Sequence, residues 1–375
     1  MSEQELLMIE KVNLKQTLDR LLAFYEGRLE NGIMAGISFP APDAGKPKAS
    51  GENQQARVRE CLILEKPWIC VDGMKETAAH LRDSLSDLIP LAYPTYNFGE
   101  SIWSALLGGE ITFSGTDTAT WSHCMTPPIK DLKKFKFPPI APQNPWLMKM
   151  QEVTDYFVKN IEPVCDVTPF IVDDCINLLV ELRGASAAYT DLYDYPEIIS
   201  RFVDWSVDVN MQVFDAQSKL LTEFTDASIG EHPLRKYSLS RMPHFGIDAY
   251  GMCNAKIYEQ YGLEQHQRMV AHYGGARMHI HGNGRRLCEL VALIKGLNCC
   301  LMGDDVGFPP AWTVVEELKK RMHPVPIEVA IPREAFLKGL KEKTLPGGVM
   351  YRLGAQSLSE ENEIMGQVFE YKPLR

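Results

Sequence analysis

The sequence predicts an α/β protein whose strands form a parallel sheet. From about residue 164 onward, short apolar segments typical of strands alternate with amphipathic segments typical of helices. Alternation of strands with helices of about ten to fifteen residues indicates βαβ units, which bring their strands together in parallel. The chain has 375 residues, of which 45% are hydrophobic, so it carries enough apolar side chains for a large core.

The elements can be assigned in chain order from the spacing of apolar residues. Residues 1–30 have the spacing of a helix, and residues 33–39 form a strand candidate. Proline and glycine mark residues 40–55 as a loop, and the prolines of residues 120–146 predict an extended connection. Further strands are expected at 164–172, 242–250, 276–281, 297–302, 325–330 and 348–353. Helices are expected at 175–182, 196–221, 255–272, 285–295, 311–321 and 333–341.

Composition and charge narrow the classes of function. The formal charge of −10 argues against a nucleic-acid or anionic-membrane partner, because both need a basic surface. No apolar run approaches the ~18 residues of a membrane span. The polar N-terminus also lacks the basic segment followed by an apolar segment that marks a secretion signal. Nine cysteines, an odd number, fit a reducing compartment. We therefore expect a cytoplasmic enzyme that acts on a small molecule.

The strongest local feature is the segment Arg277-Met278-His279-Ile280-His281-Gly282-Asn283-Gly284. Residues two apart in a strand face the same way, so Arg277, His279 and His281 share one face. At the carboxyl end of a parallel strand, two imidazoles can bind a metal such as zinc. They can equally act as acid and base near neutral pH. A third possibility is that they form hydrogen bonds at the polar end of the strands without binding a metal.

Carboxylates follow several of the predicted strands. Asp304 and Asp305 end the strand at 297–302, where one of them can supply a metal ligand or orient a histidine. The alternative is that one of them caps the following turn. Asp173 and Asp174 precede a predicted helix, which a carboxylate commonly caps, although two like charges can also raise one pKa and create a general acid. Asp174 is therefore also a catalytic candidate.

Five further residues are candidates for substrate binding or catalysis. Asp248 lies near the end of the predicted strand 242–250, on the same face as His244. Tyr351 and Arg352 close the last predicted strand, where an arginine can bind a carboxylate or a phosphate. Arg183, which precedes a glycine, is the fifth candidate.

Three segments carry a family pattern: ELRGASAAYTDLYDYPEIISRFVD, HIHGN and, more weakly, AFLKGLKEKTLPGGVMYRLG. They resemble the uroporphyrinogen decarboxylase-like superfamily, which has an Arg-Gly, Asp-Leu-Tyr-Asp and Pro-Glu segment and a His-x-Cys-Gly-Asn motif. YNFG also fits this family and makes Asn97 a candidate substrate-binding residue. The resemblance spans about residues 90–355. It implies a single (β/α)8 TIM barrel with inserted loops over residues 61–375, an N-terminal helical extension and loop over residues 1–60, and a site at the carboxyl ends of the strands.

The superfamily contains cofactor-free porphyrinogen decarboxylases and zinc-dependent methyltransferases that exchange methyl groups with a corrinoid protein. The decarboxylases hold substrate carboxylates with an N-terminal Arg-Gln-Ala-Gly-Arg motif, whereas this sequence reads GIMAGISFPAPD, without an arginine. The methyltransferases use His-x-Cys and a distant Cys. Here His279 matches the first position, His281 replaces the Cys, and LPGGVMYRLG lacks the distant Cys. The resemblance thus implies zinc held by His279, His281 and a carboxylate such as Asp304, a set that suits a methyl ether oxygen better than a thiol.

We therefore expect a methyltransferase that moves a methyl group from a small O- or N-methylated substrate to a separate corrinoid protein. In this hypothesis His279 and His281 bind the metal or protonate the leaving group, and Asp304 assists. One alternative is a decarboxylase of a porphyrinogen or a smaller acid, in which Arg183, Asp174 and Tyr351 matter more. Another is a non-catalytic barrel that binds a tetrapyrrole or a corrinoid. The chain is also a candidate homodimer.

Overall fold

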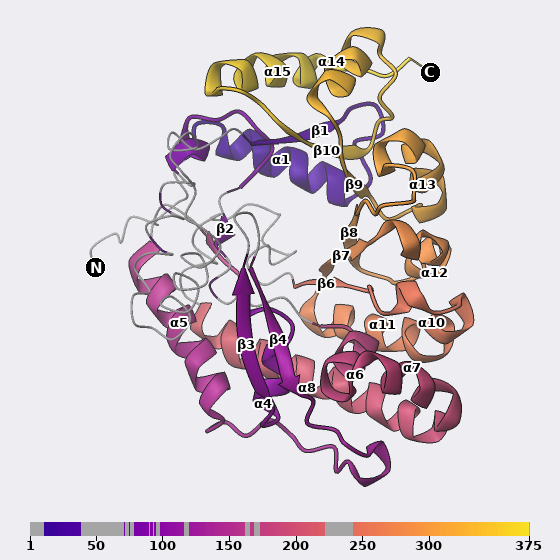
Figure 1. Cartoon of the computed structure of the whole chain (residues 1–375). Helices are drawn as coiled ribbons and strands as arrows, with labels where there is room; N and C mark the ends of the chain where they lie inside the picture. The colour runs from indigo at the N-terminus through magenta and orange to yellow at the C-terminus, as the bar shows by residue number, and fades with distance from the viewer. Residues whose placement is uncertain are drawn as a thin grey trace.

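The computed structural model describes residues 11–38, 71, 75, 79–89, 91–92, 94, 98–115, 120–161, 166–168, 173–221 and 243–374 (Figure 1). The chain forms a mixed α/β structure around a six-stranded parallel sheet, which confirms the predicted fold class at that level. In the described part of the chain, no helix is long and apolar enough to cross a membrane.

The six-stranded sheet has the order β1-β10-β9-β8-β7-β6, and every neighbouring pair is parallel. The first strand therefore pairs with the last, Met34 opposite Met350. The strands are β1 (Met34–Ser38), β6 (His244–Gly246), β7 (Ala276–Ile280), β8 (Leu297–Met302), β9 (Ile327–Ala330) and β10 (Val349–Gly354). The sequence predicted all six, although the strand expected at 242–250 is shorter than its apolar pattern indicated. β1 lies within the residues that were expected to form an N-terminal extension.

The other described strands form two smaller sheets. β2 (Leu91–Ala92) and β5 (Asp166–Val167) form a parallel pair, and β5 is the described part of the strand expected at 164–172. β3 (Glu110–Gly115) and β4 (Thr120–Thr126) form an antiparallel hairpin. The hairpin corrects the extended connection expected from residue 120, because the prolines that prompted it begin only at Pro127, after β4 has ended.

Helices follow most of the strands, and α12 to α15 lie outside the sheet (Figure 1). The single helix expected at 255–272 is broken at Gly262, where a Cβ would lie 2.8 Å from the ring of Tyr258 and 2.9 Å from that of Tyr250. The helix expected at 285–295 is instead a 3-10 turn, Gly282–Leu287, followed by α12. The helices are α1 (Leu14–Tyr25), α4 (Ile102–Leu106), α5 (Pro145–Ile161), α6 (Cys175–Arg183), α7 (Ala185–Asp194), α8 (Pro196–Leu221), α10 (Ala255–Tyr261), α11 (Leu263–Tyr273), α12 (Cys288–Val291), α13 (Val315–Met322), α14 (Arg333–Glu342) and α15 (Leu358–Glu370).

The first helix, α1, packs against one face of the sheet at the amino ends of the strands. This face, opposite the side on which α12 to α15 lie (Figure 1), is termed the inner face. Leu14, Leu18, Leu21 and Phe24 of α1 form an apolar cluster with Met34, Met350 and Cys299, which come from β1, β10 and β8. These α1 residues recur every three or four positions and so occupy one helical face. The leucine spacing near the N-terminus therefore reflects a helix that buries this face against the sheet.

A buried ionic layer crosses the sheet next to this apolar cluster. Glu328 on β9 is 2% exposed and accepts two hydrogen bonds from Arg277 on β7, at 2.8 and 2.9 Å. It also accepts two from Arg352 on β10, at 3.0 and 2.9 Å. Burial alone would raise the pKa of Glu328, but the charges of the two arginines outweigh it and lower the pKa to about 2. One carboxylate on β9 thus links its neighbour β10 to β7, which lies on the far side of β8.

Replacing Glu328 with glutamine should lower the free energy of unfolding by about 3–5 kcal/mol, because two partly buried arginines lose their counter-charge. The loss should shrink as pH falls from 4.5 toward about 2, since a carboxylate with a depressed folded-state pKa stabilises only while it is ionised. Urea unfolding at about pH 7 and about pH 3 measures both effects. The matched control is Asp19→Asn, which removes an exposed ion pair with Lys15 and should cost under ~1 kcal/mol. A loss that does not change with pH contradicts this account.

Candidate metal site

Asp248, His279 and His281 meet at the carboxyl ends of β6 and β7. One ligand atom from each of the three lies within 4.8 Å of the others, and no other such group exists among the described residues. Asp248 Oδ1 is 3.1 Å from His279 Nε2 and 3.8 Å from His281 Nε2. Burial alone would raise the pKa of Asp248, but the contact with His279 and the charge of His281 outweigh it and lower the pKa below its usual value.

Neighbouring residues fix the three side chains in place. Asp305 Oδ1 lies 2.9 Å from His281 Nδ1, and its second oxygen accepts a hydrogen bond from the Asn283 amide at 3.1 Å. The residue after Asp248, Ala249, donates its amide hydrogen to Asn177 Oδ1 at 2.7 Å. On β6, a Cβ on Gly246 would lie 2.4 Å from the His279 ring, so only glycine leaves room for that ring.

The donor set fits a zinc ion. Zinc is bound by imidazole nitrogens and carboxylate oxygens, and catalytic sites keep three protein ligands with one position open. Asp248 Oδ1 faces the Nε2 atoms of both histidines, so the three ligand atoms converge on one point where a metal would bind. The carboxylate of Asp305 on the second nitrogen of His281 is the arrangement that orients metal-bound histidines.

Asp304, predicted as the third metal ligand, does not belong to this group. Its Oδ1 accepts a hydrogen bond from the Ala311 amide at 2.7 Å and another from Arg285 at 3.1 Å. Asp304 therefore caps the turn after β8, while Asp305 orients a histidine. Both roles considered for the Asp304-Asp305 pair occur, one in each residue, and the carboxylate beside the histidines is that of Asp248.

Two predicted residues of β10 lie away from the group. The Tyr351 hydroxyl donates to the Pro346 carbonyl at 3.1 Å, and its ring packs against Phe336 of α14 with centroids 5.5 Å apart. Its side chain faces the helices because neighbouring residues of a strand point to opposite faces. Arg352 lies on the inner face, where its guanidinium binds Glu328. The catalytic role expected for Tyr351 is corrected by this orientation.

Arg183 and Asp174 have structural partners around α6. The Arg183 guanidinium binds Asp191 at 2.8 Å and donates to the Lys130 carbonyl at 2.8 Å, so it joins α6 to α7. Asp174 caps α6, since its Oδ1 accepts hydrogen bonds from the amides of Ile176 and Asn177 at 2.7 and 2.9 Å. Capping was the more common of the two roles considered for Asp174.

His244 lies next to the metal group, and its ring centroid is 5.3 Å from that of His279. Burial and the charge of Arg277 lower the pKa of His244 to about 3, so this imidazole stays neutral at physiological pH. Asn97 lies outside the described residues.

The sequence reasoning missed Glu100, which follows the YNFG segment and interacts electrostatically with Asp248, His279 and His281. Desolvation by neighbouring atoms and the charges of Asp248 and Glu181 raise the pKa of Glu100 to about 7. The residue is nevertheless exposed to solvent at its surface. The charges of His279 and His281 act in the opposite direction and lower this pKa. The signal in the sequence that could have identified Glu100 is its position directly after YNFG, the segment that resembles the family pattern.

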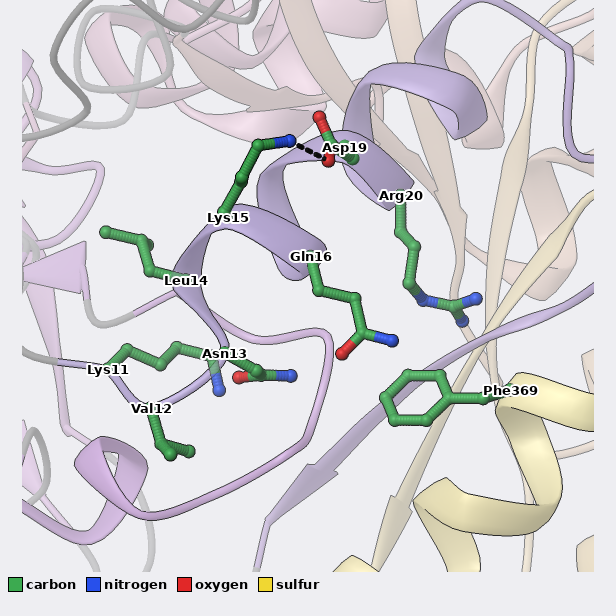
Figure 2. Close-up of a pocket in the computed structure, with 9 residues that line it drawn as sticks. All are labelled: Lys11, Val12, Asn13, Leu14, Lys15, Gln16, Asp19, Arg20 and Phe369. Carbon is green, nitrogen blue, oxygen red and sulfur yellow. Dashed lines mark hydrogen bonds and ion pairs between the residues drawn. The ribbon is translucent and has the colours of Figure 1, made fainter.

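A separate pocket lies along α1 and contains none of the predicted site residues (Figure 2). Lys15 and Asp19 form an ion pair of 2.7 Å on one side of it, and the Arg20 guanidinium lies 5.0 Å from the ring centre of Phe369. Since α1 packs at the amino ends of the strands, this pocket is remote from the histidines.

The chain matches no protein-family model, and no curated protein matches it.

Replacing Asp248 with alanine should abolish zinc binding, because the site keeps only two of its three ligands. We expect about one zinc per chain in the wild type, none in Asp248→Ala or His281→Ala, and full zinc content in the control Asp304→Asn. Elemental analysis of the four purified proteins measures this. Zinc loss in Asp304→Asn with retention in Asp248→Ala would contradict the ligand set.

Asp305→Asn should weaken zinc binding by about 10–100-fold without abolishing it, because the carboxylate orients a ligand and is not one itself. Competition with a chromophoric chelator measures the dissociation constant. Wild-type affinity in this variant would show that Asp305 does not position His281.

Proposed function

We propose that this protein is a zinc-dependent methyltransferase that takes a methyl group from a small O- or N-methylated substrate and passes it to the corrinoid of a partner protein. The observation that carries the proposal is the group Asp248, His279 and His281 at the carboxyl ends of parallel strands, with Asp305 behind His281.

We further infer that the parallel strands close into a (β/α)8 barrel. Eight described strands occur in parallel pairs, and in chain order they are β1, β2, β5, β6, β7, β8, β9 and β10. A barrel of this type pairs its last strand with its first, as β10 does with β1. Placing the β2-β5 pair between β1 and β6 would complete the circle. The candidate metal site would then lie at the end of the barrel where such enzymes hold their active sites.

The residues of the site have distinct roles in the proposed reaction. Asp248, His279 and His281 hold the metal, and Asp305 keeps the His281 ring in its binding orientation. A bound zinc ion would act as a Lewis acid on the oxygen or nitrogen that carries the methyl group. As the bond to the methyl carbon breaks, its electron pair remains on that heteroatom and the methyl group leaves to the corrinoid. A nitrogen- and oxygen-ligated metal favours an ether oxygen over a thiol as leaving group.

The charges around the site disfavour the decarboxylase alternative. A porphyrinogen carries many carboxylates and needs arginines to bind them. The described arginines that were candidates for this task are engaged elsewhere, Arg183 with Asp191 and Arg352 with Glu328. Acidic side chains surround the histidines instead, among them Glu100, which adds repulsion toward an anionic substrate.

Methyl transfer can be tested with free cob(I)alamin as the acceptor and methoxybenzene and methanol as donors. We expect the zinc-loaded protein to convert cob(I)alamin to its methylated form with at least one donor, followed by absorbance. The rate should fall at least about 100-fold in Asp248→Ala, since metal activation supplies several kcal/mol. Asp304→Asn is the control and should keep most of the rate.

Other outcomes would favour the alternatives. Release of carbon dioxide from a porphyrinogen, without methyl transfer, would replace the proposal by the decarboxylase. Tight binding of a tetrapyrrole without any product would favour the non-catalytic barrel.

A further inference from the structure

Four carboxylates that have no role in holding the metal interact with one another. They are Glu100, Asp173, Asp174 and Glu181, which we term the acidic rim. In the chain, Glu100 comes after β2 and Asp173 after β5, as Asp248 comes after β6. Asn177 links the rim to the metal site, because its amide donates to Asp174 at 2.9 Å and its side-chain oxygen accepts from the amide of Ala249, the residue after Asp248, at 2.7 Å. Ser101, the residue after Glu100, donates to Glu181 at 2.7 Å.

Two rim oxygens are buried without a hydrogen-bond partner. Asp173 is 4% exposed and Asp174 is fully buried, and in each the Oδ2 atom has no partner among the described residues. The capping of α6 uses only the other oxygen of Asp174. A buried acceptor without a donor is costly, so these atoms indicate a missing hydrogen-bond donor at this position.

The rim has no basic ion-pair partner among the residues that the structure describes. Within the described part of the chain, no lysine or arginine forms an ion pair with any of its four carboxylates, while nearby Arg183 and Arg285 bind other aspartates. Burial and the charges of Glu100, Asp174 and Glu181 raise the pKa of Asp173 well above its usual value. A ligand that brings positive charge would relieve this repulsion.

The missing group has the chemistry of an ammonium ion. A bare metal ion does not fit, because in the described residues only Asp248, His279 and His281 lie close enough together to ligate one. An ammonium group of the R-NH3+ type supplies both the charge and the N–H donors that the two buried oxygens lack. A quaternary ammonium has no N–H, so it would supply only the charge.

We propose that the acidic rim binds the primary ammonium group of the substrate, whose methoxy oxygen lies at the metal site. The substrate class is then a small methyl ether that also carries an ammonium group. This inference rests on the proposed methyl transfer for the identity of the methoxy group, but not for the binding of the ammonium.

The test compares two ligands of the same shape and different charge. At about pH 7, 2-methoxyethylamine is a cation, whereas 1-methoxypropane has the same number of heavy atoms and no charge. Ligand-observed NMR titration of the full chain measures both affinities. We expect the wild type to bind the cation at least about 10-fold more tightly, the usual contribution of a charge-assisted hydrogen bond.

Two variants locate the effect. Asp173→Asn and Glu100→Gln should each reduce the preference for the cation by about 10-fold. Glu100 contacts solvent, so its replacement tests the rim even if the buried variant fails to fold. The control is Asp155→Asn on α5, where Asp155 pairs with Lys159 at the surface, and it should leave the preference unchanged.

The outcomes separate this inference from the proposed function. A preference for the cation that persists in zinc-free His281→Ala supports the rim whatever the reaction is. Equal affinity for both ligands, or a preference that neither Asp173→Asn nor Glu100→Gln reduces, overturns the inference. Methyl transfer from neutral ethers, with no preference for the cation, would leave the proposed function intact and remove the ammonium subsite.

Discussion

Glu328 holds the centre of the described sheet together. Its carboxylate receives hydrogen bonds from Arg277 and Arg352, so β7, β9 and β10 are joined through one buried side chain. Such a layer is stable only when every charge has its partner, because a lone buried charge is costly. The strand that carries Arg277 also carries His279 two residues later on the same face. The ionic layer therefore fixes the strand on which the candidate metal site is built.

The inner face changes its chemistry along the strands. At the amino ends, α1 covers an apolar cluster that includes Cys299, whose Sγ lies 3.4 Å from the Glu328 carboxylate. The ionic layer follows, and the histidines, Asp248 and the acidic rim lie at the carboxyl ends. One end of the sheet is therefore closed by packing, whereas the polar and titratable groups gather at the other. This order favours binding and chemistry at the carboxyl ends, as in the proposed barrel.

The sequence predicted the parallel α/β class, most strands and the shared face of His279 and His281, because these follow from local periodicity. It did not identify the carboxylate that meets the histidines. Asp304 and Asp248 both follow strands, and only the loop after β8, held by Arg285 and the Ala311 amide, directs Asp304 away. The catalytic role predicted for Tyr351 depended on a different feature, the face of β10 on which its side chain lies. Which face is which depends on the side of the sheet that the helices cover.

The sequence by itself determined which side chains are available and, through the two-residue repeat of a strand, that Arg277, His279 and His281 point the same way. Tertiary structure decided which of the chain's carboxylates stand beside them. Asp248, Asp305 and Glu100 come from separate connections in the chain, and their distances to the histidines depend on the packing of strands and loops. The physical reason is that periodicity acts within one element, whereas a site is formed by contacts between elements far apart in the sequence.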